Sequence, residues 1–403
     1  MARSIVADVS IRIGAGVSTG LDPRVAAIEA GAEARAALGD SRADVACVFC
    51  SGAHLAAPEA TLEGVHEALA PPALIGCGAG GVLGGEREIE HGTAVAVWAA
   101  TLDEGEVVPF HAEASQTGAG IVVSGLPDLA RASGAILLPD PYAFPTDVLL
   151  PELSRQAPGV PVLGGISSAR TLDGEPALFL GEEVVGGAVG LRLDGVEILP
   201  CVSQGAAPVG PELTITAAEG HVIHELSGRP ALECLRAAIE QLSAAERELV
   251  SHGLLLGIVV DGERAGGAGG ADTHELQRAD FLVRGLIGAD PETGTIAVGS
   301  AVELGAVVRL HARDARSADR DLRQALSLRR EALGGARPAG ALLFTCNSRG
   351  TGMFGTPGHD AGAIAEELRG APMAGFFAAG EIGPVGGDSF LHGFTATVAV
   401  FAP

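Results

Sequence analysis

The chain has 403 residues, 47% of them hydrophobic, which is enough for two domains with conventional cores. Its 50 acidic residues outnumber 26 basic ones, for a formal net charge of −24; a surface this negative repels nucleic acids and anionic membranes, and we expect neither as a partner. The basic residues are all arginines, which excludes lysine-dependent sites such as the nucleotide-binding P-loop and the pyridoxal Schiff base.

The N-terminus lacks the apolar stretch of a secretory signal, and the six cysteines follow no regular spacing. Disulfides are typical of oxidising compartments and of closely spaced cysteines. We therefore expect a cytoplasmic protein with reduced thiols.

The first predicted unit of strands and helices lies between residues 20 and 100. Its first helix begins after Asp22, which is a suitable cap, has Pro23 in the first turn, and ends before Gly39. The elements expected next are a strand over 43–50, a helix over 58–69, a strand through Ile75 and a strand over 92–100.

A weaker copy of this unit begins at Gly134. Its expected elements are a strand over 135–138, a helix over 147–156, a strand over 161–164 and a strand over 186–193. The N-terminal half therefore contains two related units, and it ends near residue 207.

The C-terminal half opens with a longer run of expected elements. These are strands over 212–216, 221–226, 254–260, 281–287 and 306–310, and helices over 230–242 and 317–333. The helix over 317–333 is amphipathic, because its leucines recur at helical spacing.

The end of the chain repeats its beginning, because residues 342–393 match residues 46–92. Three glycines of the first block align without a gap with three of the second, and each block then reaches a His-Gly pair; the aligned glycines are Gly76, Gly81 and Gly84 with Gly375, Gly380 and Gly383. This duplication predicts an α/β fold with mixed sheets, in which strand-helix-strand-strand units form two related domains, residues 1–207 and 208–403. We expect their equivalent glycine loops to enclose a shared cleft.

These blocks resemble the FIST family, named for F-box and intracellular signal transduction proteins. Residues 76–84 are similar to the N-terminal FIST pattern, and residues 220–232, 344–350 and 375–395 to the C-terminal one. The resemblance covers almost the whole chain and implies a FIST N-terminal and a FIST C-terminal domain. It also implies a sensory protein that binds a small ligand, with amino acids as the suggested class. No kinase, cyclase or F-box segment is recognisable in the sequence, so we expect a separate signalling protein as the partner.

The C-terminal copy keeps ionic groups that the N-terminal copy lacks. Cys346 stands at a strand end three residues before Arg349, and a nearby guanidinium favours a thiolate. Glu381 follows Gly380, whereas Val82 occupies the matching place in the N-terminal copy. Arg349 and Glu381 suit the two charges of a zwitterion such as an amino acid, or they pair with each other.

The predicted ligand-binding residues are taken from the matching loops of both copies, with the N-terminal loop as an apolar wall. They are Cys346, Asn347, Arg349, Gly350, Gly380, Glu381, Gly383, His392 and Thr395 from the C-terminal copy and Cys50, Cys77 and Gly78 from the N-terminal copy.

Two other functions remain open at the sequence level. In an enzyme, Cys346 would be the nucleophile, Arg349 an anion clamp, and His392 or Glu381 the proton carrier. In a scaffold protein, no small ligand would bind at all. A binding protein of the kind that the FIST resemblance implies is favoured over both.

We expect neither a cofactor nor a metal. Residues 76–81 spell the dinucleotide-binding fingerprint, but a strand is expected after them where that motif requires a helix. His221 and His224 lie on a predicted strand without the spacing of a zinc site. Cys47 and Cys50, which have the spacing of a redox pair, point to opposite faces of their strand.

Overall fold

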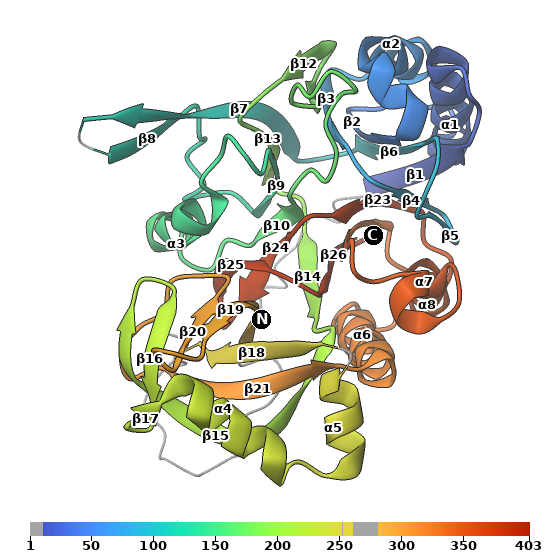
Figure 1. Ribbon diagram of the computed structural model, residues 1–403. Helices are drawn as coiled ribbons and strands as arrows, with labels where there is room; N and C mark the ends of the chain where they lie inside the picture. Colours follow the sequence, from blue (N-terminus) through green and yellow to red (C-terminus); the bar gives the residue numbers. More distant parts are fainter. Residues whose placement is uncertain (1–10, 119, 252, 261–280) are drawn as a thin grey trace, which may run out of the picture. The chain divides into compact units, whose positions relative to one another are not determined.

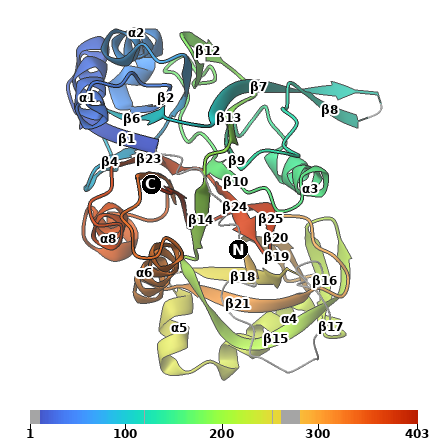
Figure 2. The same cartoon turned by 180° about the vertical axis from the view of Figure 1, so that it is seen from behind.

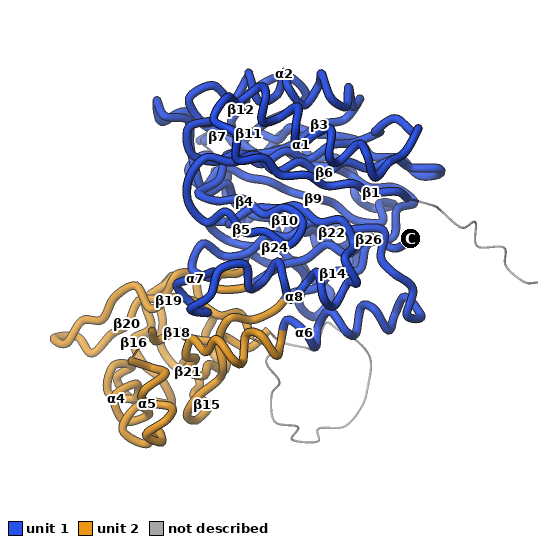
Figure 3. Tube along the Cα trace, turned by 90° about the vertical axis from the view of Figure 1, so that its right-hand side faces the viewer, with its two compact units in different colours: residues 1–202, 322–391, 396–403 blue, residues 203–321, 392–395 orange. Residues whose placement is uncertain are grey.

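The computed structural model of the protein describes residues 11–118, 120–251, 253–260 and 281–403. These residues form two compact units (Figure 3): unit 1 contains the described residues up to 202 with 322–391 and 396–403, and unit 2 contains 203–321 with 392–395. Both units combine helices with sheets, which confirms the predicted α/β class. The predicted division of the chain into domains over residues 1–207 and 208–403 stays a prediction.

The described residues of unit 1 form three sheets. The first has the strand order β1-β6-β2-β3-β11-β12, formed by Ile11–Ser18, Ala94–Leu102, Val45–Ser51, Ala73–Gly78, Leu178–Leu180 and Glu183–Val185. The second has the order β25-β24-β10-β9-β13-β7-β8, formed by Asp388–His392, Glu381–Val385, Val162–Gly165, Gly134–Pro139, Ala188–Asp194, Glu106–Thr117 and Gly120–Ser124. The third has the order β14-β26-β22-β23-β4-β5, formed by Ile198–Ser203, Ala396–Phe401, Gly340–Cys346, Met373–Ala378, Val82–Gly84 and Arg87–Ile89.

The predicted helices are present with ends within two residues of those expected, whereas η1, α5 and α7 were not predicted. In chain order they are α1 (Pro23–Leu38), the 3-10 helix η1 (Gly52–Ala56), α2 (Pro58–Leu69), α3 (Thr146–Gln156), α4 (Ala231–Gln241), α5 (Ala244–Ser251), α6 (Ala315–Ala332), α7 (Thr351–Phe354) and α8 (His359–Glu367). The start of α1 is the predicted one, because Asp22 Oδ1 accepts a hydrogen bond of 2.9 Å from Val25 N. None of the described helices is long and apolar enough to cross a membrane.

The same three-strand pattern lies at the centre of each sheet of unit 1. Two parallel strands are joined by a helix, and a third strand pairs antiparallel with the first of them. These sets are β2, β3 and β6 with helix α2; β9, β10 and β13 with helix α3; and β22, β23 and β26 with helix α8. We call the sets, with β1, β7 and β14 beside them, repeats 1, 2 and 3. The predicted duplication is confirmed, and the weaker unit at Gly134 is a third copy with the same topology.

The repeats exchange a two-stranded hairpin in a cycle. The β4–β5 hairpin of repeat 1 pairs with β23 of repeat 3, the β24–β25 hairpin of repeat 3 pairs with β10 of repeat 2, and the β11–β12 hairpin of repeat 2 pairs with β3 of repeat 1. Equivalent backbone hydrogen bonds mark the three crossings, from Phe377 N to Gly81 O (3.0 Å), from Ile166 N to Gly380 O (2.8 Å) and from Gly78 N to Ala177 O (2.7 Å). Unit 1 therefore has a pseudo-three-fold topology, in which no repeat completes its own sheet.

One hydrophobic core is shared by the inner faces of the three sheets. Its largest side chains are aromatic, and the ring centroids of Phe49 and Phe376 lie 5.0 Å apart, those of Trp98 and Phe401 5.1 Å. The outer faces carry separate cores under helices: α1 and α2 on the first sheet, α3 on the second, and α6 with α8 on the third (Figures 1 and 2). Along β2 the side chains alternate between these cores, so Cys47 and Cys50 lie on opposite faces as predicted.

The described residues of unit 2 form a single antiparallel sheet. Its order is β15-β21-β18-β19-β20-β16-β17, formed by Ala206–Glu219, Val307–Arg313, Leu254–Val259, Phe281–Asp290, Thr295–Val298, Val222–Leu226 and Arg229–Pro230. Helices α4 and α5 pack against this sheet through apolar side chains, among them Leu235 of α4 and Leu249 of α5.

Candidate functional site

The loop after β22, residues 346–350, is the polar segment that the sequence singled out. Cys346 ends the strand with 9% of its surface exposed, and its Sγ atom lies 3.0 Å from Ser348 Oγ. Asn347 is exposed, while its backbone N donates a hydrogen bond of 2.9 Å to Ala378 O of the neighbouring strand. The loop is therefore anchored by the sheet and presents polar side chains at its end.

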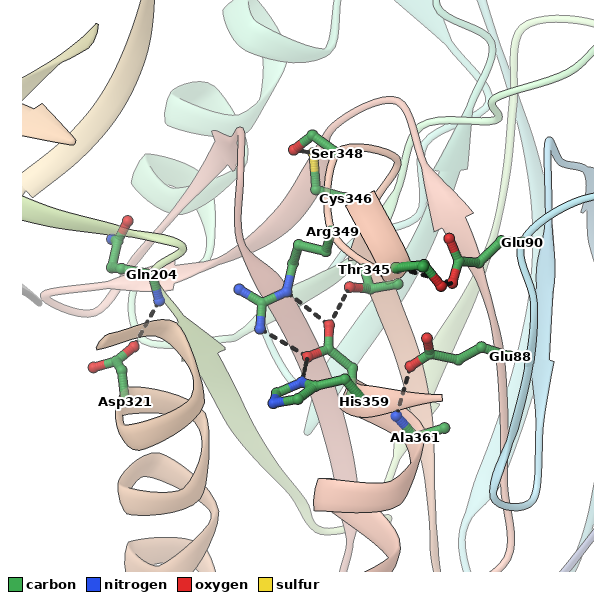
Figure 4. Close-up of polar contacts among 12 residues, drawn as sticks. Glu88, Glu90, Gln204, Asp321, Thr345, Cys346, Ser348, Arg349, His359 and Ala361 are labelled. Carbon is green, nitrogen blue, oxygen red and sulfur yellow. Dashed lines mark hydrogen bonds and ion pairs between the residues drawn. The ribbon is translucent and has the colours of Figure 1, made fainter. Parts of the chain in front are cut away.

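Arg349 turns from this loop into the protein (Figure 4). Its Nε atom lies 2.7 Å from Asp360 Oδ2 and its Nη2 atom 2.8 Å from Asp360 Oδ1, so the pair is bidentate. The exposed fractions of the two side chains are 0% and 1%. The third nitrogen, Nη1, has no hydrogen-bond partner among the described residues. A buried guanidinium is thus held rigidly with one donor group unused.

Asp360 lies in the first turn of α8 and holds Arg349 as a carboxylate. Thr345 Oγ1 donates a hydrogen bond of 2.8 Å to it, and His359 Nδ1 lies 3.1 Å from its other oxygen. Burial raises the pKa of Asp360, but Arg349 outweighs burial and holds it well below its usual range. Burial likewise lowers the pKa of Arg349, and Asp360 reverses this effect, so the pKa of Arg349 is raised. Both groups stay charged.

Glu381 is the second predicted ionic residue, and it begins β24 with no exposed surface. Its charge acts on Arg349, whose pKa it helps to raise, as does Cys346. The bidentate partner of Arg349 is nevertheless Asp360, a residue that the sequence analysis missed. A carboxylate in the first turn of a helix is common, since it interacts favourably with the helix dipole, and so Asp360 carried no special signal.

The residues predicted from the N-terminal copy lie inside the cores. Cys50 packs under α1 and α2, and Cys77 lies in the central core; neither has exposed surface. Burial raises the pKa of Cys50 to about 12 and raises that of Cys77 as well. Gly78 is also buried, and a Cβ atom there would lie 2.7 Å from Leu55 Cδ2. In this arrangement none of the three faces solvent, from which a ligand would come.

The remaining predicted residues divide between the two units. Gly350, Gly380 and Gly383 are buried in unit 1, whereas His392 and Thr395 belong to unit 2, with 3% and 1% of their surfaces exposed. Among the predicted residues of unit 1, the structure thus brings Cys346, Arg349 and Glu381 together around the end of β22.

Two further acidic residues reach this region from the exchanged hairpin of repeat 1. Glu88 Oε1 accepts a hydrogen bond of 2.8 Å from Ala361 N at the start of α8, and Glu90 Oε1 accepts one of 2.9 Å from Thr351 N at the start of α7 (Figure 4). Burial raises the pKa of Glu88. Their positions depend on hairpin exchange between residues more than 260 apart in sequence, so no local pattern could have identified them.

The glycine fingerprint of residues 76–81 is followed by strand β4 and not by a helix, as predicted. Without a helix N-terminus there is no positive end of a dipole for a pyrophosphate. Among the described residues, no three His, Cys, Asp or Glu side chains are grouped as metal ligands.

We expect Cys346 to be the first of the six cysteines to react with iodoacetamide at neutral pH. It is the most exposed of them, while burial raises the pKa of Cys47, Cys50, Cys77 and Cys234 and so withholds the reactive thiolate. Mass spectrometry of peptides after brief labelling would measure the order, with Cys346→Ser as the control. Equal labelling of Cys234 and Cys346 would contradict the expectation.

Comparison with known proteins agrees with the resemblance seen in the sequence. The model of the FIST N domain matches residues 44–229, and the model of the FIST C domain matches residues 231–384. The uncharacterized protein Rv0628c of Mycobacterium tuberculosis is 45% identical over 393 residues, which cover 97% of this chain and 100% of that protein. The uncharacterized protein Mb0898c of Mycobacterium bovis is 44% identical over 97% of this chain and 99% of its own length.

Proposed function

Because the chain belongs to the FIST family, whose domains are sensory domains of signal transduction, we propose that it senses a small zwitterion such as an amino acid. The proposed site is the loop of residues 346–350 with Arg349 and Glu381 behind it. We further propose that the protein works in the cytoplasm and that a separate signalling protein responds to its ligand-bound state, in keeping with its composition and charge.

The observation that carries the proposal is the unused donor of Arg349. The Asp360 carboxylate holds Nε and Nη2 in place, so Nη1 keeps a fixed direction without further ordering of the side chain. A ligand carboxylate would accept its hydrogen bond there, which would satisfy a buried polar group that otherwise destabilises the protein. The ligand would approach past Asn347 and Ser348, the more exposed residues of the loop.

The zwitterionic class follows from the charges around the loop. Glu381 and Asp360 lie close enough to Arg349 to raise its pKa, so one positive and two negative groups share a small buried volume. A ligand with a carboxylate alone would add a third negative charge, whereas the ammonium group of a zwitterion would face Glu381 and leave the net charge of the site unchanged.

Thermal unfolding of the purified protein with a panel of amino acids and small zwitterions tests the proposal. A ligand at 100 times its Kd adds about 2.7 kcal/mol to the free energy of unfolding, which raises Tm by several degrees. We expect Arg349→Lys, which keeps the charge beside Asp360 but has no Nη1, to lose this shift, and Asn347→Ala to reduce it. Thr356→Ala, an exposed change in the same segment, should leave it intact.

Two results would count against a sensor of this kind. A flat panel with the wild-type protein would remove the zwitterion as a ligand class. A shift that survives in Arg349→Lys would place the ligand elsewhere in the protein.

The alternative is a cysteine enzyme, which one observation favours. Cys346 combines the largest exposed fraction among the cysteines with an electrostatic interaction with Arg349. The two functions differ in their response to Cys346→Ser. A sensor should keep its ligand-induced shift in this variant, whereas an enzyme should lose turnover of the same compound.

A further inference from the structure

In the part of repeat 2 that the structure describes, a helix that the other two repeats have is missing. In repeat 1, α1 follows β1 and packs on β1 and β6. In repeat 3, α6 packs beside β14: Leu322 and Leu326 share a core with Cys201 of that strand. In repeat 2, β7 is followed by strand β8, and the described chain between β8 and β9 contains no helix. In the second sheet, β8 therefore forms the edge at the place where the first and third sheets have a helix packed on their edge strands β1 and β14.

β8 is an exposed edge strand with apolar side chains. It is the last strand of the second sheet, and its hairpin with β7 projects from that sheet (Figure 1). Ile121 and Val122 are 52% and 49% exposed. The β7–β8 register runs without a bulge from Glu113 opposite Ser124 to Thr117 opposite Gly120. Proteins usually block such edges with a charge, a proline or a bulge, and β8 has none of them.

Strand β8 and the groove beside it are uncharged, although the chain as a whole is strongly acidic; Glu113, opposite Ser124, is the one charged residue in the β7–β8 register. Residues 114–127 contain no charged side chain, against a net charge of −24 for the chain. A groove of about 280 Å³ beside the hairpin is lined only by uncharged residues, among them Ile121, Tyr142 and Phe144. Two copies of this protein repel each other over most of their surfaces, and this region is one where they do not.

We propose that β8 pairs antiparallel with β8 of a second copy around a two-fold axis through Val122. The strand is self-complementary in this arrangement: Val122 faces Val122 of the second copy on one side of the sheet, and Ile121 faces its Val123 on the other. Such apolar, β-branched cross-strand pairs are favourable, and the unused backbone groups of both edges are satisfied. The pairing closes after two copies, as an isologous interface does, and joins their second sheets into one.

A partner of another kind fits this surface less well. A basic protein would be attracted to the acidic remainder of the surface and would find no carboxylate on β8 itself. The self-complementary apolar strand therefore favours a second copy of the chain.

Sedimentation velocity of the full chain over a range of concentrations tests the pairing. The wild-type protein should shift from monomer to dimer as its concentration rises. Val122→Lys places two like charges directly opposite each other at the axis, and it should remain a monomer over the same range. Val25→Lys is the matched control, because Val25 is 52% exposed on α1, away from the hairpin, and this variant should dimerise like the wild type.

Hydrogen exchange gives a second readout that needs no variant. The backbone amides of residues 120–124 that point away from β7 should exchange more slowly as the protein concentration rises, while those of other exposed strands should not change. A wild-type protein that stays monomeric throughout, or a dimer that persists in Val122→Lys, would overturn the proposal. So would equal loss of the dimer in Val25→Lys.

Discussion

Gly375→Ala is expected to prevent unit 1 from folding stably. A Cβ atom at this position of β23 would lie 1.8 Å from Leu343 O of the paired strand β22, far inside any real contact. The position of a Cβ atom is fixed by its backbone, and Leu343 O is itself a backbone atom, so neither can move away alone. The two parallel strands would therefore have to separate, which would open the shared core. We expect a loss of more than about 4 kcal/mol in the free energy of unfolding, the range reached only by severe core defects.

Urea unfolding and soluble yield would measure this effect. Gly362→Ala is the matched control, because Gly362 lies within α8 and a Cβ atom there has no neighbour within 4 Å. Alanine at that site should raise the stability by up to about 1 kcal/mol, since glycine is the poorer helix former. A Gly375→Ala protein with the wild-type urea midpoint would show that the strand contact is not as close as described.

The same close approach occurs at the equivalent position of each repeat. A Cβ atom at Gly76 would lie 1.9 Å from Val48 O, and one at Gly164 would lie 1.9 Å from Leu137 O. The sequence alignment paired Gly76 with Gly375, and the structure adds Gly164 as the third member. Alanine at either of these glycines is therefore expected to be as damaging as at Gly375.

Asp360→Asn is expected to destabilise unit 1 by about 3–5 kcal/mol, the usual effect of leaving one buried charge without its partner. The substitution preserves the shape of the side chain but removes the charge that compensates Arg349, whose side chain is fully buried. Glu67→Gln is the matched control, because it breaks an ion pair with Arg24 in which both side chains are about half exposed. Exposed pairs contribute at most about 1 kcal/mol.

The acid dependence of unfolding should separate the two variants further. The pKa of Asp360 is held below its unfolded value, so its contribution is complete above about pH 4 and is lost as the pH falls towards the folded value. Asp360→Asn should lack this part of the acid destabilisation, and Glu67→Gln should keep it. The raised pKa of Glu88 acts in the opposite direction, adding stability as that group takes up its proton. Unfolding midpoints measured between neutral pH and pH 3 would test this, and equal acid profiles for the two variants would contradict it.

Local patterns accounted for the principal helices and for the central strands of the repeats. The cap at Asp22 with Pro23 after it and Gly39 beyond the last turn delimited α1, and Pro58 and Leu69 bounded α2 as predicted. These signals work because the backbone groups at a helix end are satisfied by residues only a few positions away. The repeated glycines were equally visible, since the close strand contact of Gly76 and Gly375 permits no other residue.

The sequence by itself thus determined the principal helices, the central strands of the repeats, the α/β class, the family and the presence of repeats. Only the tertiary structure decided that three repeats exchange hairpins, that Asp360 holds Arg349, and that Glu88 and Glu90 reach helices α8 and α7. It also placed Cys50 and Cys77 in the cores and left β8 without a covering helix. The physical reason is the range of the interactions: caps and periodicity join neighbours in the chain, whereas burial, ion pairing and edge exposure depend on which distant segments pack together.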